Sequence, residues 1–335
     1  MRYRVRAPHG YNINKVLLAI VIIIAACMIL FCDGRNKKQP QNDEQIKTKI
    51  TTIAKVDVFD HEANRVVAMD LDDYMVCVVA AEMPASFHSE ALKAQAVSAR
   101  TYTIYKAKRS GCNATEKPAD VCTNSAHCQA FVSIADMKEN WGDEFEQKLS
   151  KIKRAVDETK GELIIYKGDV IEVFYHASAG GMTEDSGNVF SAQRPYLVSV
   201  SSEGEQDSNN YYSQVRLSID EFIGKLKGVQ GDFSISRDDI KNQIGEPKRY
   251  ITGRVDSIKI GTSTFSGLHI RKIFKLKSTN FSITIEDDDV VFSSIGFGHG
   301  VGMSQNGANA MAKDGEEYHE ILKHYFSGVE IVDDY

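Results

Sequence analysis

The stretch Asp70-Leu-Asp-Asp-Tyr-Met-Val-Cys-Val-Val-Ala-Ala-Glu82-Met-Pro84 predicts an amphipathic helix that ends just before a proline. Asp70 can cap the first turn, because an aspartate side chain accepts hydrogen bonds from the free N–H groups there. Pro84 disfavours helical geometry at the preceding residue and should stop the helix. Apolar side chains recur at i, i+3, i+4, i+7 and i+8, namely at Leu71, Tyr74, Met75, Val78 and Val79. We expect this face to pack against a core.

Glu82 is the exceptional residue of this helix. It lies eleven residues after Leu71, which is about 20° away around the helix axis, so its carboxylate continues the apolar face. It also falls in the last turn, where the helix dipole disfavours an anion. Burial and the dipole both raise the pKa of a carboxyl group, as a general acid at neutral pH requires. The alternative is a glutamate at the edge of the face whose head reaches water.

Four blocks of the sequence, in order from about residue 52 to the C-terminus, resemble the SpoIID family (stage II sporulation protein D). The family has amidase-enhancer (LytB-type) relatives in bacterial cell walls. The blocks are Val78-Val-Ala-Ala-Glu82-Met-Pro84 continued by Glu90-Ala-Leu-Lys-Ala-Gln95-Ala-Val-Ser-Ala-Arg100-Thr-Tyr102, then Cys128-Gln-Ala130, Phe174-Tyr-His-Ala-Ser-Ala-Gly-Gly181, and Gly298-His-Gly-Val-Gly-Met-Ser-Gln-Asn-Gly-Ala308.

The resemblance implies a lytic transglycosylase that cleaves the β-1,4 bond between N-acetylmuramic acid and N-acetylglucosamine in peptidoglycan. It further implies glycan strands stripped of stem peptides as substrate, and a role in engulfment during endospore formation. The implied partners are the SpoIIP amidase/endopeptidase and the SpoIIM membrane protein. The alternative function is a non-catalytic, glycan-binding activator of a cell-wall amidase. A zinc amidase using His176 and His299 is disfavoured, because neither lies in an HExxH pattern.

A single carboxylate is enough for such a reaction. Ordinary glycosidases use two carboxyl groups about 5–9.5 Å apart. The other acids on the predicted helix, Asp70, Asp72 and Asp73, would lie roughly 14–18 Å from Glu82. In a lytic transglycosylase the C6 hydroxyl of the muramic acid is the nucleophile, so Glu82 would act first as acid and then as base. No cofactor is expected for this chemistry.

Further candidates for glycan binding come from the blocks. Arg100 shares a face of the second helix and can reach a cleft, or form a structural ion pair instead. His176 and Ser178 lie at a predicted strand end just before Gly180-Gly181, a good place for hydrogen bonds to a sugar. The alternative for His176 is a histidine packed in the core. Alternating glycines near residue 300 let the backbone approach another chain or a glycan closely. The full set is Arg100, His176, Ser178, His299, Ser304 and Gln305.

Three cysteines and a histidine cluster in a polar stretch: Cys112, Cys122, His127 and Cys128. Thiolates and an imidazole are the usual ligands of structural zinc. Some clostridial-type members of the resembled family are thought to hold zinc near this loop. The alternative is a disulfide, Cys112–Cys122 or Cys122–Cys128, because such bonds persist outside the cytoplasm. Cys77 is expected to be a buried apolar residue.

The N-terminus predicts a membrane anchor. Residues 16–32 carry no charge, and Arg2, Arg4, Arg6 and Lys15 precede them. The run is at the short end for a transmembrane helix, and the preceding charges place residues 1–15 in the cytoplasm. A cleaved signal peptide is the alternative. Residues 33–51 are polar and predict a flexible linker, which leaves residues 52–335 as one extracytoplasmic domain.

The remaining pattern predicts an α+β fold: a single mixed domain with a β-rich lobe and an active-site cleft. Charged residues make up 26% of the chain and its net charge is −6, which argues against nucleic acid as a partner. Strands and helices do not alternate regularly, as a doubly wound sheet would require. We expect hairpins at 53–58 with 65–69 and at 162–166 with 169–177, helices at 70–82, 89–106, 218–227, 304–313 and 317–326, an irregular segment at 111–140, and mostly strands at 250–285.

Overall fold

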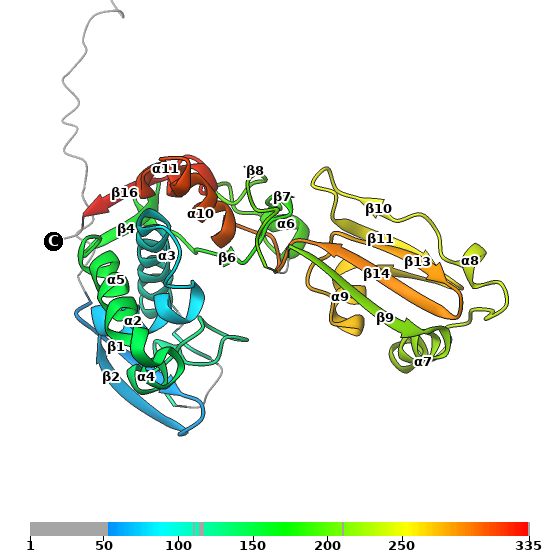
Figure 1. Cartoon of the computed structure of the whole chain (residues 1–335), viewed down its shortest axis with the longest axis horizontal. Helices are drawn as coiled ribbons and strands as arrows, with labels where there is room; N and C mark the ends of the chain where they lie inside the picture. The colour runs from blue at the N-terminus through cyan, green and yellow to red at the C-terminus, as the bar shows by residue number, and fades with distance from the viewer. Residues whose placement is uncertain (1–52, 110, 114–116, 210, 334–335) are drawn as a thin grey trace, which may run out of the picture. The chain divides into compact units, whose positions relative to one another are not determined.

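The computed structural model describes residues 53–109, 111–113, 117–209 and 211–333, which belong to one compact unit, residues 49–335 (Figure 1). The predicted tail 1–15, anchor 16–32 and linker 33–51 lie outside the described residues. Among the helices that are described, none is both long and apolar enough to span a bilayer.

Two hydrophobic cores divide the described chain into two lobes. The larger core collects side chains between Val56 and Leu197 and again between Val301 and Val329; we call this part the helical lobe. The smaller core lies between Leu217 and Phe292, and we call residues 211–295 the sheet lobe. The mixture of helices with small sheets agrees with the predicted α+β class.

The helical lobe is built around two adjacent helices and the strands that flank them. Its elements are β1 (Lys55–Asp60), β2 (Arg65–Asp70), α2 (Leu71–Glu82), α3 (Ser89–Ala107), β3 (Val121–Cys122), α4 (Ile134–Trp141), η1 (Gly142–Glu144), α5 (Phe145–Asp157), β4 (Glu162–Tyr166), β5 (Asp169–Val170), β6 (Tyr175–His176), β7 (Gly181–Met182), α6 (Ser186–Val189), β8 (Ser201–Ser202), β15 (Met303–Ser304), α10 (Gln305–Lys313), α11 (Tyr318–Tyr325) and β16 (Glu330–Asp333).

The first helix begins and ends where its sequence predicts. The Asp70 side chain accepts a hydrogen bond from the Asp72 N–H at 3.0 Å, and α2 ends at Glu82 before an extended Met83. Leu71, Tyr74, Met75, Val78 and Val79 are all buried. Because α3 and α5 pack on α2, even Val76 and Cys77 are covered, so the helix is apolar on more than one face.

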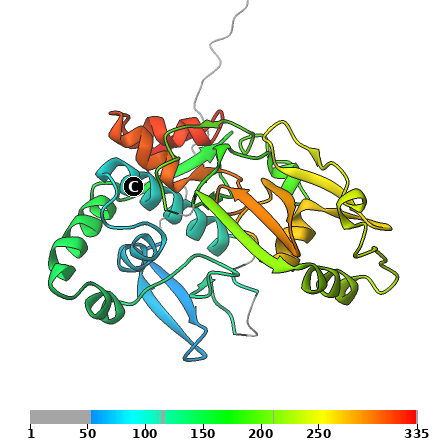
Figure 2. The same ribbon diagram turned by 45° about the vertical axis from the view of Figure 1, so that its right-hand side comes forward.

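The second helix is the central support of this lobe. α3 contacts α2, α5, β4, α10 and α11. The two C-terminal helices, α10 and α11, also contact each other and lie beside α3 (Figures 1 and 2). Their bounds agree with the predicted helices at 304–313 and 317–326 to within a residue.

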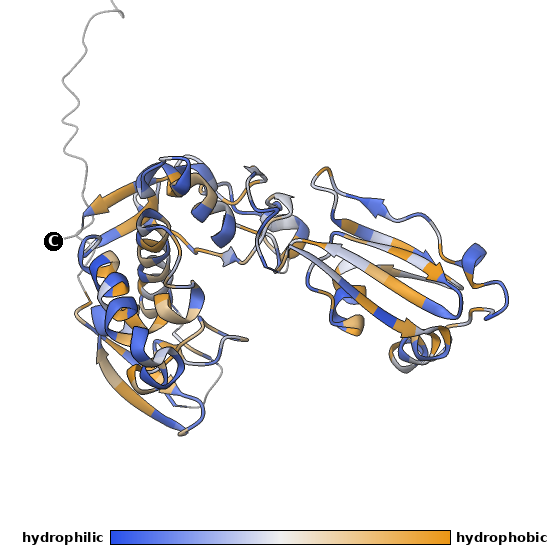
Figure 3. Cartoon of the chain, viewed as in Figure 1, coloured by the Kyte–Doolittle hydropathy of each residue, from blue (hydrophilic) through white to orange (hydrophobic). Residues whose placement is uncertain are grey.

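The sheet lobe contains two three-stranded antiparallel sheets. Its elements are β9 (Tyr212–Ser218), α7 (Ile219–Val229), α8 (Ile240–Gln243), β10 (Lys248–Arg249), β11 (Val255–Ile260), β12 (Ser263–Ser266), α9 (Gly267–Phe274), β13 (Phe281–Glu286) and β14 (Asp289–Ile295). The sheets have the orders β10-β11-β12 and β13-β14-β9. Apolar residues mark β14 clearly in Figure 3, which agrees with its position as the central strand.

Three predicted elements are wrong in detail. The segment 250–285 contains a helix, α9, because the Ser266 hydroxyl caps it by accepting from the His269 N–H at 3.2 Å. The segment 111–140 ends in α4, capped in the same way by Ser133 at the Asp136 N–H. The predicted strand 169–177 is reduced to β5 and β6, because β6 pairs with β15 instead of with β4.

The two lobes join where the last two sequence blocks meet. Strands β6 and β15 are parallel, with His176 opposite Ser304, and Ser178 forms a bridge with Phe297. Arg254 of the sheet lobe donates to the Ala179 carbonyl at 2.6 Å. A Cβ at Gly300, where φ is +86°, would collide with the Arg254 guanidinium. The glycines near residue 300 therefore admit this chain's own side chains and backbone at close range.

Candidate active site

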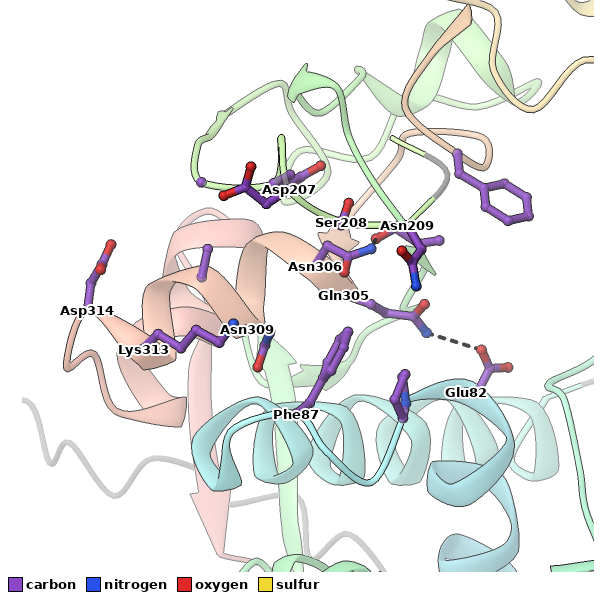
Figure 4. A pocket seen from close by; sticks show the side chains of 16 residues that line it. Glu82, Phe87, Asp207, Ser208, Asn209, Gln305, Asn306, Asn309, Lys313 and Asp314 are labelled. Carbon is purple, nitrogen blue, oxygen red and sulfur yellow. Dashed lines mark hydrogen bonds between the residues drawn. The ribbon is translucent and has the colours of Figure 1, made fainter. Parts of the chain in front are cut away.

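Glu82 is held by groups from two distant parts of the chain. Its Oε1 accepts a hydrogen bond from the Ala130 N–H at 2.7 Å, and its Oε2 accepts one from Gln305 Nε2 at 3.1 Å (Figure 4). The side chain is half-buried. Burial raises the pKa of Glu82, and the Ala130 and Gln305 donors only partly offset this. The direction of the shift agrees with the sequence-based expectation for a general acid.

Gln305 is itself oriented from behind. Its Nε2 also lies 3.4 Å from the Oε1 of Gln95, which is fully buried on α3. Gln305 is the only one of the six predicted glycan-binding residues that the structure brings into hydrogen-bond contact with Glu82, as far as the described residues show. It follows the Ser304 cap at the start of α10, so the rigid helix end fixes its position.

A chain of hydrogen bonds leads from α3 to the neighbourhood of Glu82. The Thr103 hydroxyl donates to the Ala99 carbonyl at 2.9 Å, so it must accept from the Gln129 amide, whose Nε2 lies 3.0 Å away. The amide oxygen of Gln129 is then left to accept from the Tyr175 hydroxyl at 2.7 Å. The single proton of that hydroxyl is therefore directed at Gln129.

This arrangement decides what Tyr175 offers to Glu82. Burial raises the pKa of Tyr175 well above its usual value, and the charge of Glu82 acts in the same direction, so the hydroxyl keeps its proton. Because that proton is committed to Gln129, Tyr175 presents lone pairs to its neighbours. With its proton on Gln129, the Tyr175 hydroxyl has no second proton to donate to the Glu82 carboxylate.

Glu82 lies at one end of an open cleft of about 610 Å³. Residues that the sequence analysis did not single out line most of it, and in Figure 4 the side chains of Gln305 and Asn306 lie between Glu82 and the far end. The lining residues are Glu82, Pro84, Phe87, Ala177, Gly204, Glu205, Asp207, Ser208, Asn209, Phe297, Gln305, Asn306, Asn309, Ala310, Lys313 and Asp314. Amides and hydroxyls of this kind bind sugars, and the volume is typical of a ligand site.

The other acids of the cleft are not placed to assist Glu82. Asp207 and Asp314 lie across the cleft from it (Figure 4). The Glu205 carboxylate is buried, where it accepts from the Ser202 hydroxyl and from the Gly180 N–H at 3.3 Å. None of the other acids that line the cleft is hydrogen-bonded to Glu82, whose partners among the described residues are Ala130 and Gln305.

Ser178 reaches the cleft indirectly. Its hydroxyl is buried and accepts a hydrogen bond from Asn306 Nδ2 at 3.0 Å, and it lies 3.2 Å from the hydroxyl of Ser208. Asn306 and Ser208 both line the cleft, whereas Ser178 does not. Ser178 thus positions two lining side chains.

The remaining predicted glycan-binding residues are committed to the protein's own structure. His176 is buried with Nδ1 3.2 Å from the Val301 carbonyl oxygen, and its ring lies 5.5 Å from that of His299. Burial lowers the pKa of His299 to about 4 and that of His176 well below its usual value, so both rings are neutral near pH 7. Ser304 is fully buried and caps α10 at the Gly307 N–H.

Arg100 supports the alternative reading as an ion-pair partner. Its guanidinium is 2% exposed, donates to the Thr159 and Val156 carbonyls at 2.7 and 3.2 Å, and lies 3.6 Å from Asp72. It does not line the Glu82 cleft. Arg100 thereby ties α2, α3 and the end of α5 together.

Cys112, Cys122, His127 and Cys128 converge as the sequence predicts. Their ligand atoms all lie within 4.8 Å of one another, and the three thiols are free. The Nδ1 atom of His127 lies 3.5, 3.7 and 3.3 Å from the sulfurs of Cys112, Cys122 and Cys128. A tetrahedral zinc with bonds of about 2.1–2.3 Å would separate its sulfur and nitrogen ligands by roughly 3.6 Å. The four residues therefore fit a zinc ion.

The orientation of His127 agrees with this fit. Its Nε2 lies 3.0 Å from Asn113 Oδ1, which accepts the N–H and leaves the Nδ1 lone pair facing the thiols. The cluster is also next in sequence to a partner of Glu82, because Gln129 and Ala130 follow Cys128 and the Ala130 N–H donates to Glu82.

Sequence reasoning missed Ala130 as a hydrogen-bond partner of Glu82, and also missed the bonded pair Gln129 and Tyr175. Each lies in one of the blocks that carry the family resemblance. The blocks were therefore a usable signal, but the Ala130 contribution is a backbone N–H, which no side-chain pattern reveals.

Comparison with known proteins agrees with these blocks. The SpoIID family, described as "Stage II sporulation protein", matches residues 59–166. The chain is 32% identical over 340 residues to stage II sporulation protein D of Bacillus subtilis (strain 168), covering 96% of this chain and 95% of the relative. It is 34% identical over 268 residues to the protein of the same name from Bacillus amyloliquefaciens, covering 78% and 74% of the two chains.

A more distant match connects the chain to cell-wall proteins. An amidase enhancer of Bacillus subtilis (strain 168) is 29% identical over 303 residues, which cover 75% of this chain and 39% of that protein. Near-complete coverage by the first relative, together with the matched family region around Glu82, shows that this chain belongs to the SpoIID family of sporulation proteins.

Proposed function

We propose that this protein is a lytic transglycosylase that cleaves the β-1,4 bond between N-acetylmuramic acid and N-acetylglucosamine in peptidoglycan glycan strands. The observation that carries the proposal is a half-buried Glu82 with a raised pKa, alone at the end of a sugar-sized polar cleft. Strands stripped of stem peptides are the proposed substrate, as the family resemblance implies, and the cleft offers the amides of Asn209, Gln305, Asn306 and Asn309 to the sugar hydroxyls.

The proposed reaction uses Glu82 twice. The protonated carboxyl first gives its proton to the glycosidic oxygen, and the C–O bond to the anomeric carbon breaks. The C6 hydroxyl of the same muramic acid then attacks that carbon and loses its proton to Glu82. The products are a free 4-hydroxyl on the departing sugar and a 1,6-anhydro muramyl end, and the carboxyl is protonated again without water being consumed.

The cellular setting is proposed from the family and the sequence. Residues 16–32 are the proposed single-pass anchor with a cytoplasmic N-terminus, which places the catalytic domain outside the membrane. The proposed role is glycan cleavage during engulfment in endospore formation, with the SpoIIP amidase/endopeptidase and the SpoIIM membrane protein as partners.

A structural zinc ion at Cys112, Cys122, His127 and Cys128 is part of the proposal. The convergence of the four ligand atoms supports it. The ion would supply no chemistry to the cleaved bond. It would instead hold the segment that carries Gln129 and Ala130, whose amide groups fix Tyr175 and Glu82.

The match to an amidase enhancer favours one second candidate, a glycan-binding protein that stimulates an amidase without cleaving glycan. Such a protein would need the cleft but not the acid. The two functions therefore differ in their dependence on Glu82.

The experiment compares the full-length protein with Glu82→Gln and with Asp73→Asn, a matched control on the exposed side of the same helix. Products from peptide-free glycan strands are analysed by mass spectrometry. We expect anhydro-muramyl ends from the parent protein and from Asp73→Asn, and a loss of about 10³-fold or more in Glu82→Gln. Hydrated muramyl ends would show that the reaction is hydrolysis and not transglycosylation. Unchanged cleavage by a folded Glu82→Gln protein would refute the role of Glu82.

A further inference from the structure

A second groove lies on the sheet lobe, away from Glu82. It encloses about 770 Å³ where β9, β14 and β13 meet the β10–β11 hairpin. Its lining is Tyr212, Ser213, Gln214, Arg249, Gly253, Asn280, Phe281, Ser282, Ser293, Ser294 and Ile295. None of these residues belongs to the cleft that contains Glu82.

The lining presents one aromatic ring and a row of small polar groups. Tyr212 is 66% exposed, one of the largest exposures of an apolar side chain among the described residues. Next to it, strand pairing aligns Gln214, Ser293 and Ser282 across the sheet, and Gln214 Nε2 donates to the Ser293 hydroxyl at 3.0 Å. A pyranose ring offers an apolar C–H face to an aromatic ring and hydroxyls to amides and serines, so this surface matches a sugar.

The charge of the groove is also informative. Among its lining residues, Arg249 is the one charged side chain and no carboxylate is present. Its Nη1 and Nη2 donate to the Gly253 and Phe281 carbonyls at 2.7 and 2.8 Å, which holds the guanidinium at the groove edge. N-acetylmuramic acid carries a lactyl carboxylate once the stem peptide is removed, and a fixed guanidinium is a good partner for such an anion.

Residues that line the groove lie only two or three positions in sequence from residues that line the cleft. Asn209 and Phe297 line the cleft, whereas Tyr212 and Ile295 line the groove. Three residues of chain span at most about 11 Å and two residues about 7 Å. A glycan strand of a few sugars that leaves the cleft at Asn209 or Phe297 can therefore reach Tyr212.

We propose that this groove is a second glycan-binding site, which takes a portion of the same strand at a distance from the bond at Glu82. Tyr212 stacks on one sugar ring, and Arg249 binds a muramyl lactyl carboxylate. The proposal rests on the proposed function in that it takes peptide-free peptidoglycan strands as the ligand. It adds that the sheet lobe gives the protein a preference for long strands.

The test measures binding separately from cleavage. The full-length Glu82→Gln protein is titrated calorimetrically with short and long peptide-free oligomers of the muramyl disaccharide, and with chitooligosaccharides, which lack the lactyl group. Tyr212→Ala should weaken binding of long oligomers of both kinds by about five- to tenfold and leave short ones unchanged. Arg249→Gln, which removes the positive charge but keeps an amide donor, should weaken only long muramyl oligomers.

Two exposed sheet-lobe residues outside the groove lining serve as matched controls: Thr284→Ala on β13 and Lys259→Ala on β11 should change nothing. Equal affinity of Tyr212→Ala and its parent for long oligomers overturns the proposal. An equal loss for short and long oligomers also overturns it, because a second site acts only on strands that reach it. If binding depends on strand length but the parent protein with Glu82 intact cleaves no glycan, the proposed function is refuted and the second binding site is not.

Discussion

Polar side chains beside Glu82 and polar side chains in the sheet-lobe groove are packed in opposite ways. In the helical lobe, Gln95 and Gln129 are buried and bonded to other side chains, and the network ends at Glu82. In the sheet lobe, Gln214 and Arg249 lie exposed on an open sheet and groove. A buried network holds one carboxyl group in place and sets its protonation, whereas an open face provides contact area. Substitutions should therefore have large effects on catalysis in the helical lobe and smaller ones on binding in the sheet lobe.

Glu82→Asp should give the largest effect among variants that retain an acid. Shortening the side chain withdraws the carboxyl from the Ala130 N–H and from Gln305. Misplacement by about 1 Å at a reacting group costs about 100-fold in rate. Initial rates on peptide-free glycan strands measure this. Asp73→Glu on the same helix should retain the parent rate, and a Glu82→Asp rate within threefold of the parent would show that the network does not position the acid.

Cys122→Ser should abolish zinc binding and lower the cleavage rate by about tenfold or more. Structural zinc sites are closed by four protein ligands, so removal of one leaves the site incomplete, and here it would release the segment that carries Gln129 and Ala130. Metal analysis of the purified protein and its melting temperature follow the change. Cys77→Ala removes a buried thiol outside the cluster and should keep the metal. A metal-free parent protein whose Cys112, Cys122 and Cys128 thiols can all be alkylated would contradict the zinc assignment.

Tyr175→Phe should lower the rate by about tenfold and shift its pH dependence. If the Tyr175 proton points at Gln129, the hydroxyl stabilises protonated Glu82, and its removal lowers the pKa of Glu82. The rate falls as pH rises through that pKa, so the alkaline limb of the pH–rate profile should move to lower pH. A move to higher pH would mean that Tyr175 donates to the carboxylate instead.

The smallest effect on cleavage should come from His299→Asn at the join between the lobes. Burial, Arg271 and Arg254 lower the pKa of His299 to about 4. The unfolded chain binds this proton more readily, so stability is complete above the unfolded pKa near 6.5 and is lost as pH falls toward 4. The asparagine oxygen can still accept from the Val301 N–H, so the rate at pH 7 should change less than threefold.

Melting temperatures between pH 7 and 4 test this last expectation. The parent should lose stability more steeply than His299→Asn over that range, although His176 beside it still titrates. His269→Asn, at an exposed histidine, is the control. Identical pH profiles for the parent and His299→Asn would show that the join is not acid-sensitive through this ring.

The accuracy of the sequence-based predictions follows the range of the interactions involved. The helix 70–82 and its cap could be predicted because capping and periodicity act within a few residues. The cluster at Cys112 to Cys128 could be predicted because its members lie within one segment. The helix α9 was missed because its short sequence alternates apolar residues in a way that also suits a strand, and packing of Ile270 and Phe274 in the core decides between them.

The roles of the block residues were harder to assign. His176, His299 and Ser304 lie in the blocks that carry the family resemblance, but among the described residues their hydrogen bonds go to the protein's own backbone and none goes to Glu82. Gln305 lies beside them and contacts Glu82. Successive side chains of a strand point to opposite faces, and those at the start of a helix also point in different directions. Only the three-dimensional packing fixes which of them faces the cleft.

By itself, the sequence determined where the first helix begins and ends, and that a carboxyl group would sit on its apolar side at the terminal turn. The tertiary structure alone decided what surrounds that carboxyl: an N–H from 48 residues away and an amide from 223 residues away. Local hydrogen bonds and side-chain periodicity are properties of neighbouring residues. The protonation of a buried group is set by whatever the fold packs against it, which no local pattern contains.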